Sequence, residues 1–129
     1  MDSEATPKYD FHIAVDTNFV ERRRVEDGER YIFTYTITIS NIGNVAAKLL
    51  RRYWLIHDGQ ERVEEVRGDG VVGEQPHLFP GQSFRYTSGT LLESPVGTME
   101  GVYYMIADDG NNFEAKIPRF VLTANPFLH

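Results

Sequence analysis

The stretch GDGVVG, from Gly68 to Gly73, places three glycines at the spacing G-x-G-x-x-G. This spacing is typical of loops that hold nucleotide phosphates, where the glycines let the backbone approach and a following helix points its N-terminus at the anion. Here the next residues include Pro76 and Pro80, and two prolines this close cannot lie inside a helix. The preceding segment ERVEEVR is short and charged, whereas a dinucleotide-binding strand is buried and apolar. We therefore reject a dinucleotide-binding fold, and we reject a P-loop because no Gly-Lys-Ser/Thr follows.

A weaker anion-binding interpretation stays open. Successive backbone N–H groups in a glycine-rich turn can form a concavity that binds an anion without a helix. The candidate site for an anion or pyrophosphate comprises Gly68, Gly70, Gly73 and Arg67. Further arginines could approach the loop from nearby positions or through strand pairing, namely Arg51, Arg52, Arg62 and Arg85. Acidic neighbours would repel a phosphate, namely Glu64, Glu65, Asp69 and Glu74. We expect a structural loop in preference to an anion site.

Four other residues have side chains that suit a divalent cation. His57-Asp58 and Asp108-Asp109 offer imidazole and carboxylate ligands. The same residues precede glycines in ordinary hairpin turns, and the D-x-[DN]-x-[DN]-G spacing of a calcium loop is missing. Turn formation is therefore favoured over metal binding at both places.

The sequence contains no recognisable set of catalytic residues. His12 falls on the polar face of an expected strand, and Ser88 lies within a strand rather than in a nucleophile elbow. Catalysis by a nucleophile would need that residue together with an oriented base and an oxyanion site. We expect a protein that is not an enzyme and that uses no cofactor.

The composition limits the compartment and the partners. The chain has 129 residues, a formal net charge of −6 and no cysteine. The negative charge argues against general nucleic-acid binding, and the lack of cysteine fits a reducing cytoplasm. No apolar run is long enough to span a membrane, and the N-terminus has no signal peptide. We expect a soluble cytoplasmic protein with a flexible segment over residues 1–8 and one domain over residues 9–129.

Alternation with period two predicts the elements that position these residues. In RYIFTYTITIS, aromatic and aliphatic side chains alternate with Thr and Ser, as in a half-buried strand. The segment KLLRRYWLIHDG is apolar on both faces and predicts a central strand, whereas ERVEEVR predicts a charged edge strand. Turn signals recur about every 8 to 12 residues. We predict an immunoglobulin-like or fibronectin type III-like antiparallel β-sandwich of about seven or eight strands.

The expected core lies on the inner faces of this sandwich. Its predicted members are Phe33, Tyr35, Ile37, Tyr53 or Trp54, Leu55, Phe84, Tyr86 and Tyr104. In the glycine loop, Val71 and Val72 are unusual for a loop that only binds phosphate, because both are β-branched and apolar. We expect at least one of these valines to be exposed and to bind a protein partner, with Glu74 and Gln75 as a polar rim.

Several segments together resemble the ApaG family over nearly the whole chain. They are RYIFTYTITISNIG, LLRRYWLIHDG, VRGDGVVGEQP, SFRYTSGTLLESPVGTMEGVYYM and FEAKIPRFVL, and the ending NPFLH is also similar. The resemblance implies a fibronectin type III-like sandwich. It also implies an association with cobalt resistance and magnesium efflux, and a genetic neighbourhood with a diadenosine tetraphosphatase.

The same resemblance bears on the partner and on the glycine loop. Related domains in F-box proteins and in a DNA polymerase delta-interacting protein look like protein-binding modules. The family's glycine motif has been proposed as a pyrophosphate-binding loop, which in this chain would be Gly68, Gly70 and Gly73. We therefore expect a binding module that acts through a protein partner. The alternative is an accessory protein that binds nucleotide or pyrophosphate, and direct binding of a divalent cation is a weaker third.

Overall fold

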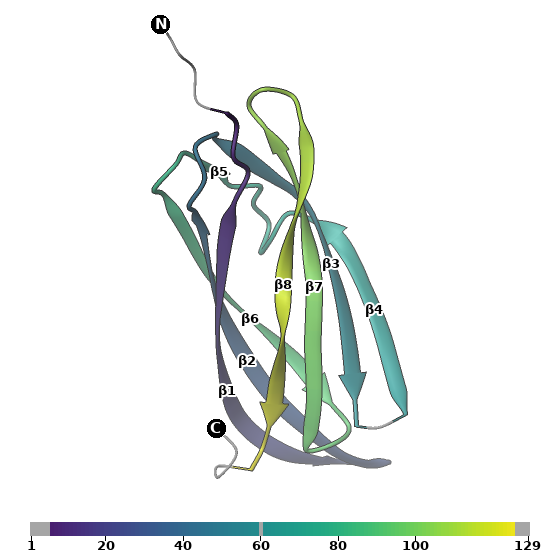
Figure 1. The fold of residues 1–129 in the computed structure, drawn as a ribbon. Helices are drawn as coiled ribbons and strands as arrows, with labels where there is room; N and C mark the ends of the chain where they lie inside the picture. Colours follow the sequence, from purple (N-terminus) through teal and green to yellow (C-terminus); the bar gives the residue numbers. More distant parts are fainter. Residues whose placement is uncertain (1–5, 60, 126–129) are drawn as a thin grey trace, which may run out of the picture.

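The structure is a computed structural model that describes residues 6–59 and 61–125. Every regular element in these ranges is a β-strand (Figure 1). In chain order the strands are β1 (Phe11–Val25), β2 (Gly28–Asn41), β3 (Ala47–Asp58), β4 (Arg62–Asp69), β5 (His77–Leu78), β6 (Ser83–Leu92), β7 (Val96–Ala107) and β8 (Asn112–Thr123). The predicted all-β class is therefore confirmed.

The strands form two antiparallel sheets packed into a sandwich (Figure 1). One sheet has the order β1-β2-β6, and the other has the order β4-β3-β7-β8, with β5 paired to the first residues of β3. As predicted, the charged segment ERVEEVR contributes the edge strand β4 and KLLRRYWLIHDG contributes the central strand β3. The chain crosses between the sheets after β2, after β5 and after β6, as in fibronectin-like sandwiches.

The core lies between the two sheets and follows the alternation of the sequence. In β2 the side chains of Phe33, Ile37 and Ile39 are buried, while the intervening threonines stay half-exposed on the outer face. Burying a side chain of this size stabilises the fold by about 1.5–3 kcal/mol. Five predicted core residues are confirmed as buried: Phe33, Tyr35, Ile37, Trp54 and Tyr86.

Two predicted core positions need correction. Tyr104 was expected inside, but β7 buries Tyr103 completely, at 0% exposure, and directs Tyr104 to the outer face. Both faces of β7 carry apolar side chains, so alternation alone does not distinguish them. Leu55 lies on the outer face of β3 and is only half-buried. Phe84 is half-buried and packs against the core, as predicted.

A bulge in β3 sets up the region of the glycine loop. Leu49 pairs with Met105 and Arg51 with Tyr104, so one extra residue, Leu50, lies between two successive pairs. The bulge shifts the alternation, because Leu49 and Trp54 are both buried although an odd number of positions separates them. From Arg51 onward the odd-numbered residues of β3 therefore face outward, and Arg52 faces the interior.

Both ends of the chain lie partly outside the described residues. The predicted flexible segment 1–8 stays a prediction, because residues 1–5 lie outside the described residues. Within that segment, the Lys8 N–H donates to Asn44 Oδ1 at 2.7 Å, and Asn44 Nδ2 donates to the Thr6 carbonyl at 3.0 Å. All but the first residue of the ending NPFLH lie outside the described residues. Over residues 6–59 and 61–125, no helix has the length and apolar character to cross a membrane.

Candidate functional site

The glycine loop begins at Gly68, which lies against the side chain of Arg52. The two residues are paired across β3 and β4, and a Cβ added to Gly68 would come within 2.6 Å of Arg52 Nη2. Arg52 Nη1 donates to the carbonyl oxygens of Asp69 at 2.8 Å and Gly70 at 2.9 Å. The first glycine of the motif therefore makes room for an arginine of the same protein.

Arg52 also lies near a group of buried tyrosines on the inner faces of both sheets. The hydroxyls of Tyr86 and Tyr103 are 2.5 Å apart and share a hydrogen bond. Burial raises the pKa of Tyr35, Tyr86 and Tyr103, and the positive charge of Arg52 opposes this rise in the pKa of all three. Arg52 thus connects the glycine loop to the interior of the sandwich.

The second half of the motif is a tight two-residue turn. Val71 N–H donates to the Glu74 carbonyl at 2.8 Å, and Glu74 N–H donates back to Val71 at 2.9 Å. The central residues Val72 and Gly73 have φ values of 43° and 82°, so both lie in the left-handed region required by a type I′ turn. Gly70 has a φ of 59°, and a Cβ there would lie 2.2 Å from the Glu74 carbonyl oxygen.

The two valines of this turn have opposite environments. Val71 is 1% exposed and belongs to the core, whereas Val72 is 53% exposed at the tip. Glu74 and Gln75 are exposed beside the tip, and Gln75 Nε2 donates to the carbonyl of the bulged Leu50 at 3.0 Å. Residues 71–75, hereafter the Val72 turn, therefore present one apolar side chain from a base fixed to β3.

Backbone N–H groups of the loop are largely used by the protein itself. The Gly70 N–H donates to Leu50 at 2.9 Å, and those of Val71 and Glu74 close the turn. An anion-binding concavity needs successive N–H groups that point at the ligand. These three donors are not available for that purpose.

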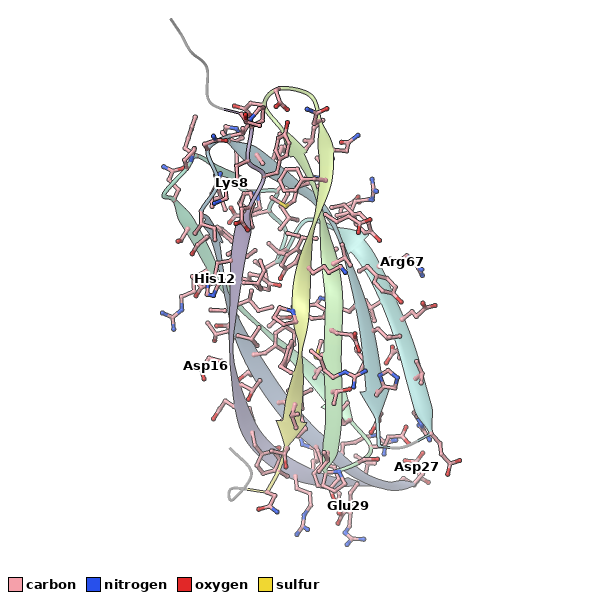
Figure 2. The ribbon with its side chains drawn as sticks, in the orientation of Figure 1. Lys8, His12, Asp16, Asp27, Glu29 and Arg67 are labelled. Carbon is pink, nitrogen blue, oxygen red and sulfur yellow. The ribbon has the colours of Figure 1, made fainter. Side chains whose placement is uncertain are left out.

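Arginine side chains nevertheless gather beside Gly68. A hollow of about 400 Å³ is lined by Arg51, Arg52, Arg67, Gly68, Asp69 and Tyr104. The Arg51 guanidinium lies 5.0 Å from the centre of the Tyr104 ring. The Arg67 guanidinium lies 4.7 Å from the centre of the Tyr53 ring, and Figure 2 shows Arg67 projecting outward from β4. The structure thus brings Arg67 and Gly68 together with Arg51 and Arg52, while Gly73 belongs to the turn.

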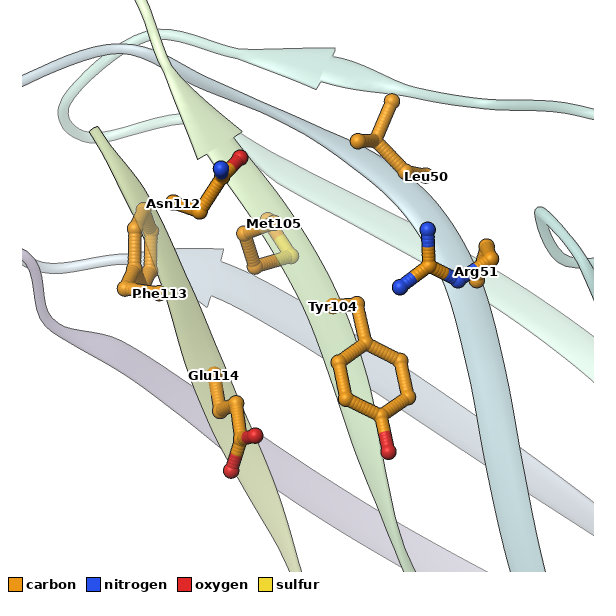
Figure 3. A pocket seen from close by; sticks show the side chains of 7 residues that line it. All are labelled: Leu50, Arg51, Tyr104, Met105, Asn112, Phe113 and Glu114. Carbon is orange, nitrogen blue, oxygen red and sulfur yellow. The ribbon is translucent and has the colours of Figure 1, made fainter. Parts of the chain in front are cut away.

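A second hollow adjoins the first one on the outer face of β3, β7 and β8. It has a volume of about 280 Å³, and Arg51 and Tyr104 line both hollows. Figure 3 shows the Arg51 and Tyr104 side chains next to each other, with Phe113 and Glu114 contributed by β8. The carboxylate of Glu114 makes this second hollow less suited to an anion.

The four residues considered as metal ligands do not form one site. His57 and Asp58 end β3, whereas Asp108 and Asp109 follow β7, and the antiparallel pairing places them at opposite ends of the sheet. Asp58 accepts hydrogen bonds from the N–H groups of Glu93, at 2.7 Å, and Ser94, at 3.0 Å, so its carboxylate orders the turn between β6 and β7. No group of three or more His, Cys, Asp or Glu residues suited to a metal occurs in the described part of the chain.

Asp108 and Asp109 have protein partners that sequence reasoning missed. His77 Nε2 lies 2.8 Å from Asp108 Oδ1, and the Tyr9 hydroxyl donates to Asp109 Oδ2 at 2.5 Å. The hydrogen bond from Tyr9 lowers the pKa of Asp109. These pairs join segments far apart in the sequence, so no local sequence pattern predicts them. They hold the loops at this end of the sandwich together.

Comparison with known proteins gives the family. Residues 21–107 match the family described as ApaG domain. The chain belongs to the ApaG family. Protein ApaG of Thiobacillus denitrificans is 52% identical over 122 residues, which cover 95% of this chain and 96% of that protein. Protein ApaG of Dechloromonas aromatica is 52% identical over 124 residues, which cover 96% of this chain and 98% of that protein.

Solved structures agree with the sandwich. A crystal structure of a Bordetella pertussis protein has a TM-score of 0.85 and 43% identity, covering 92% of this chain and 96% of that chain. A second X-ray structure, from the Northeast Structural Genomics Consortium, has a TM-score of 0.87 and 43% identity, covering 92% of this chain and 90% of that chain. The ApaG family and its β-sandwich are therefore established for this chain.

Proposed function

We propose that this ApaG-family chain is a non-catalytic binding module that recognises a protein partner through the Val72 turn. The observation that carries the proposal is the conformation of Val72. A β-branched residue at a φ of 43° is strained, and such strain costs of order 1–3 kcal/mol. Asn or Gly would form the same turn without this cost.

The surroundings of Val72 support a contact surface. The strained side chain is 53% exposed, so burial offsets little of the strain. Val71 and Gln75 attach the base of the turn to the core and to Leu50 of β3. A pre-ordered apolar side chain with a polar rim suits a protein interface, because little conformational entropy is lost on binding.

A non-catalytic role fits the candidate nucleophile and base. Ser88 is half-buried on the inner face of β6, where it is the register partner of Tyr35 in β2. His12 is exposed on the outer face of β1, as Figure 2 shows. The two lie on opposite faces of one sheet and cannot act as a nucleophile and its base.

The cellular role follows from the family resemblance. We infer a contribution to cobalt resistance and magnesium efflux, exerted in the cytoplasm through the partner and without insertion into the membrane. Because the carboxylates considered as metal ligands are hydrogen-bonded to other groups of the protein, the role is assigned to protein recognition and no cofactor is invoked.

The experiment compares two valines of matched exposure. Val72 is 53% exposed on the turn and Val63 is 54% exposed on β4. In the first part, variants that carry a photo-crosslinking residue at position 72 or at position 63 are expressed in cells that lack their own ApaG-family protein. In the second part, cells that express Val72→Asp or Val63→Asp are tested for cobalt tolerance. We expect a discrete protein adduct from position 72 only, and loss of tolerance in Val72→Asp only. Full tolerance in a well-folded Val72→Asp variant would show that the proposed function is wrong.

A second candidate is the binding of a nucleotide or pyrophosphate. The observation that favours it is the hollow where Arg51, Arg52 and Arg67 meet Gly68. The arginines are partly engaged, because Arg52 donates to loop carbonyls and Arg67 lies 3.8 Å from Glu65. The engaged guanidinium groups and the internally bonded N–H groups make this the less favoured candidate.

A further inference from the structure

Strand β6 is an edge that the rest of the described chain does not cover. It is the last strand of the order β1-β2-β6, and among residues 6–59 and 61–125 it pairs only with β2. At the other edge of this sheet, β1 contacts β8 of the opposite sheet, whereas β6 makes no comparable contact with a strand of that sheet. Gly89 in the middle of β6 is exposed, so its backbone is accessible.

The other three sheet edges carry features that hinder pairing with another strand. In β1 the register is broken between Phe19 and Glu21, and β8 has a register shift beside Pro118. In β4 the sequence RVEEVRGD is dominated by charge. Bulges, prolines and charges are the usual devices that protect an edge strand.

Strand β6 has little of this protection. Its sequence SFRYTSGTLL holds one charge, Arg85, and no proline, and it pairs with β2 from Ser83 to Leu92 without a register shift. Leu91 on its outer face is 60% exposed, the largest value among the exposed large hydrophobic residues of the described chain. A regular and nearly uncharged edge is suited to pairing with a further strand.

We propose that β6 pairs antiparallel with β6 of a second copy of this chain, with the two-fold axis at Thr87. The argument is the fit of the strand to itself. With the axis at Thr87, each residue faces the one equally distant on the other side, and every off-axis pair sets a large side chain against a small one. On the outer face Arg85 faces Gly89 and Leu91 faces Ser83; on the inner face Tyr86 faces Ser88 and Phe84 faces Thr90.

Other registers lose this fit. An axis at Arg85 would oppose two arginines, and like charges directly opposite each other are destabilising. An axis at Ser88 would set Arg85 against Leu91 and leave Gly89 facing only Thr87. The Thr87 register joins the two three-stranded sheets into one continuous sheet with isologous symmetry.

Charge predicts how this association depends on salt. Each copy has a formal net charge of −6, so the two copies repel each other at long range. Salt screens this repulsion, while the backbone hydrogen bonds between the strands are little affected. The dimer is therefore expected to become more stable as the salt concentration rises.

The test is sedimentation equilibrium over a wide range of protein concentration. We expect a mass that rises with concentration from one chain of 14.8 kDa to twice that value. In Thr87→Lys two lysines face each other on the axis, and we expect dimer affinity to fall at least tenfold. Asn18→Lys adds the same charge to the outer face of β1, and Thr87→Val removes the hydroxyl that bonds Thr36. Both controls are expected to dimerise.

A charge-reversed mixture fixes the register. Thr87→Lys mixed with Thr87→Glu should restore the dimer, because opposite charges then meet on the axis, while each variant alone stays monomeric. The restoration also shows that the variants are folded. A wild-type chain that stays monomeric at millimolar concentration would overturn the proposal. A dimer that Thr87→Lys leaves intact, that Asn18→Lys weakens equally, or that the mixture fails to restore would also overturn it.

Discussion

The guanidinium of Arg52 lies against the Cα of Gly68, where a Cβ would come within 2.6 Å of Nη2. The same guanidinium donates to the carbonyls of Asp69 and Gly70, and it faces the buried tyrosines of the core. The glycine spacing resembles a phosphate-binding motif, but here the first glycine makes room for a cation of the protein itself, the guanidinium of Arg52. The first glycine of the motif has a structural reason that needs no ligand.

Replacing Gly68 by Ala should destabilise the fold by about 1–3 kcal/mol, because the new methyl group overlaps a side chain that two hydrogen bonds hold in place. Urea unfolding of the single variants and of the double variant with Arg52→Ala measures the coupling between the two positions. The loss of unfolding free energy caused by Gly68→Ala should be at least halved in the background of Arg52→Ala. Additive costs would show that the two residues do not constrain each other.

Gly70→Ala and Gly73→Ala should differ although both glycines have positive φ. At Gly70 the added Cβ meets the Glu74 carbonyl at 2.2 Å, whereas at Gly73 nothing lies within 4 Å. We expect a cost of about 1 kcal/mol for Gly73→Ala, from the left-handed conformation alone, and about 3 kcal/mol or more for Gly70→Ala. Thermal unfolding of both variants gives the comparison. Equal costs would contradict the close approach at Gly70.

Val72→Asn should stabilise the protein by about 1 kcal/mol while weakening partner binding. Asn tolerates the left-handed region that a β-branched residue avoids, and the exposed valine contributes little to the core. The free energy of unfolding in urea measures the change. Val63→Asn is the matched control and should destabilise, because Asn is unfavourable in a strand. A less stable Val72→Asn variant would show that the valine is not strained.

The buried tyrosines predict a loss of stability at alkaline pH. Burial raises the folded-state pKa of Tyr86 and Tyr103 above the ordinary value of 10.0, so the unfolded chain ionises first. The two tyrosines contribute their full stabilisation of the fold when the pH is below the ordinary pKa. This contribution is lost as the pH rises above that pKa. The free energy of unfolding should fall as the pH rises above about 10, and fall less when both tyrosines are replaced by Phe. An equal decline in the double variant would exclude these residues as the cause.

The sequence predicted the fold where one face of a strand is clearly apolar. In β2 the alternation of Phe33, Tyr35 and Ile37 with threonines identified the buried face directly. It misjudged β7, because Tyr103 and Tyr104 are both plausible core residues, and the choice depends on pairing with β3. The extra residue at Leu50, which directs Arg52 inward, has no local signal.

The candidate site was predicted in part. Sequence spacing singled out the glycines and the two valines, and it placed Arg67 beside them. The positive φ of Val72 could not be predicted, because local preferences argue against it and the conformation is imposed by the surrounding hydrogen bonds. Contacts such as His77 with Asp108 depend on loops brought together only by the completed sandwich.

The role of the glycine loop is tested most directly by titrating the protein with diadenosine tetraphosphate, and separately with inorganic pyrophosphate, while following its backbone amides by NMR. If the loop is a structural base for the Val72 turn, the amides of Gly68, Gly70 and Gly73 should not shift at millimolar ligand. Arg67→Glu should then behave as the wild-type protein does, and so should a distant charge reversal, Arg24→Glu on the β1–β2 hairpin. Saturable shifts confined to the three glycines, abolished by Arg67→Glu and retained in Arg24→Glu, would contradict this account and establish an anion site.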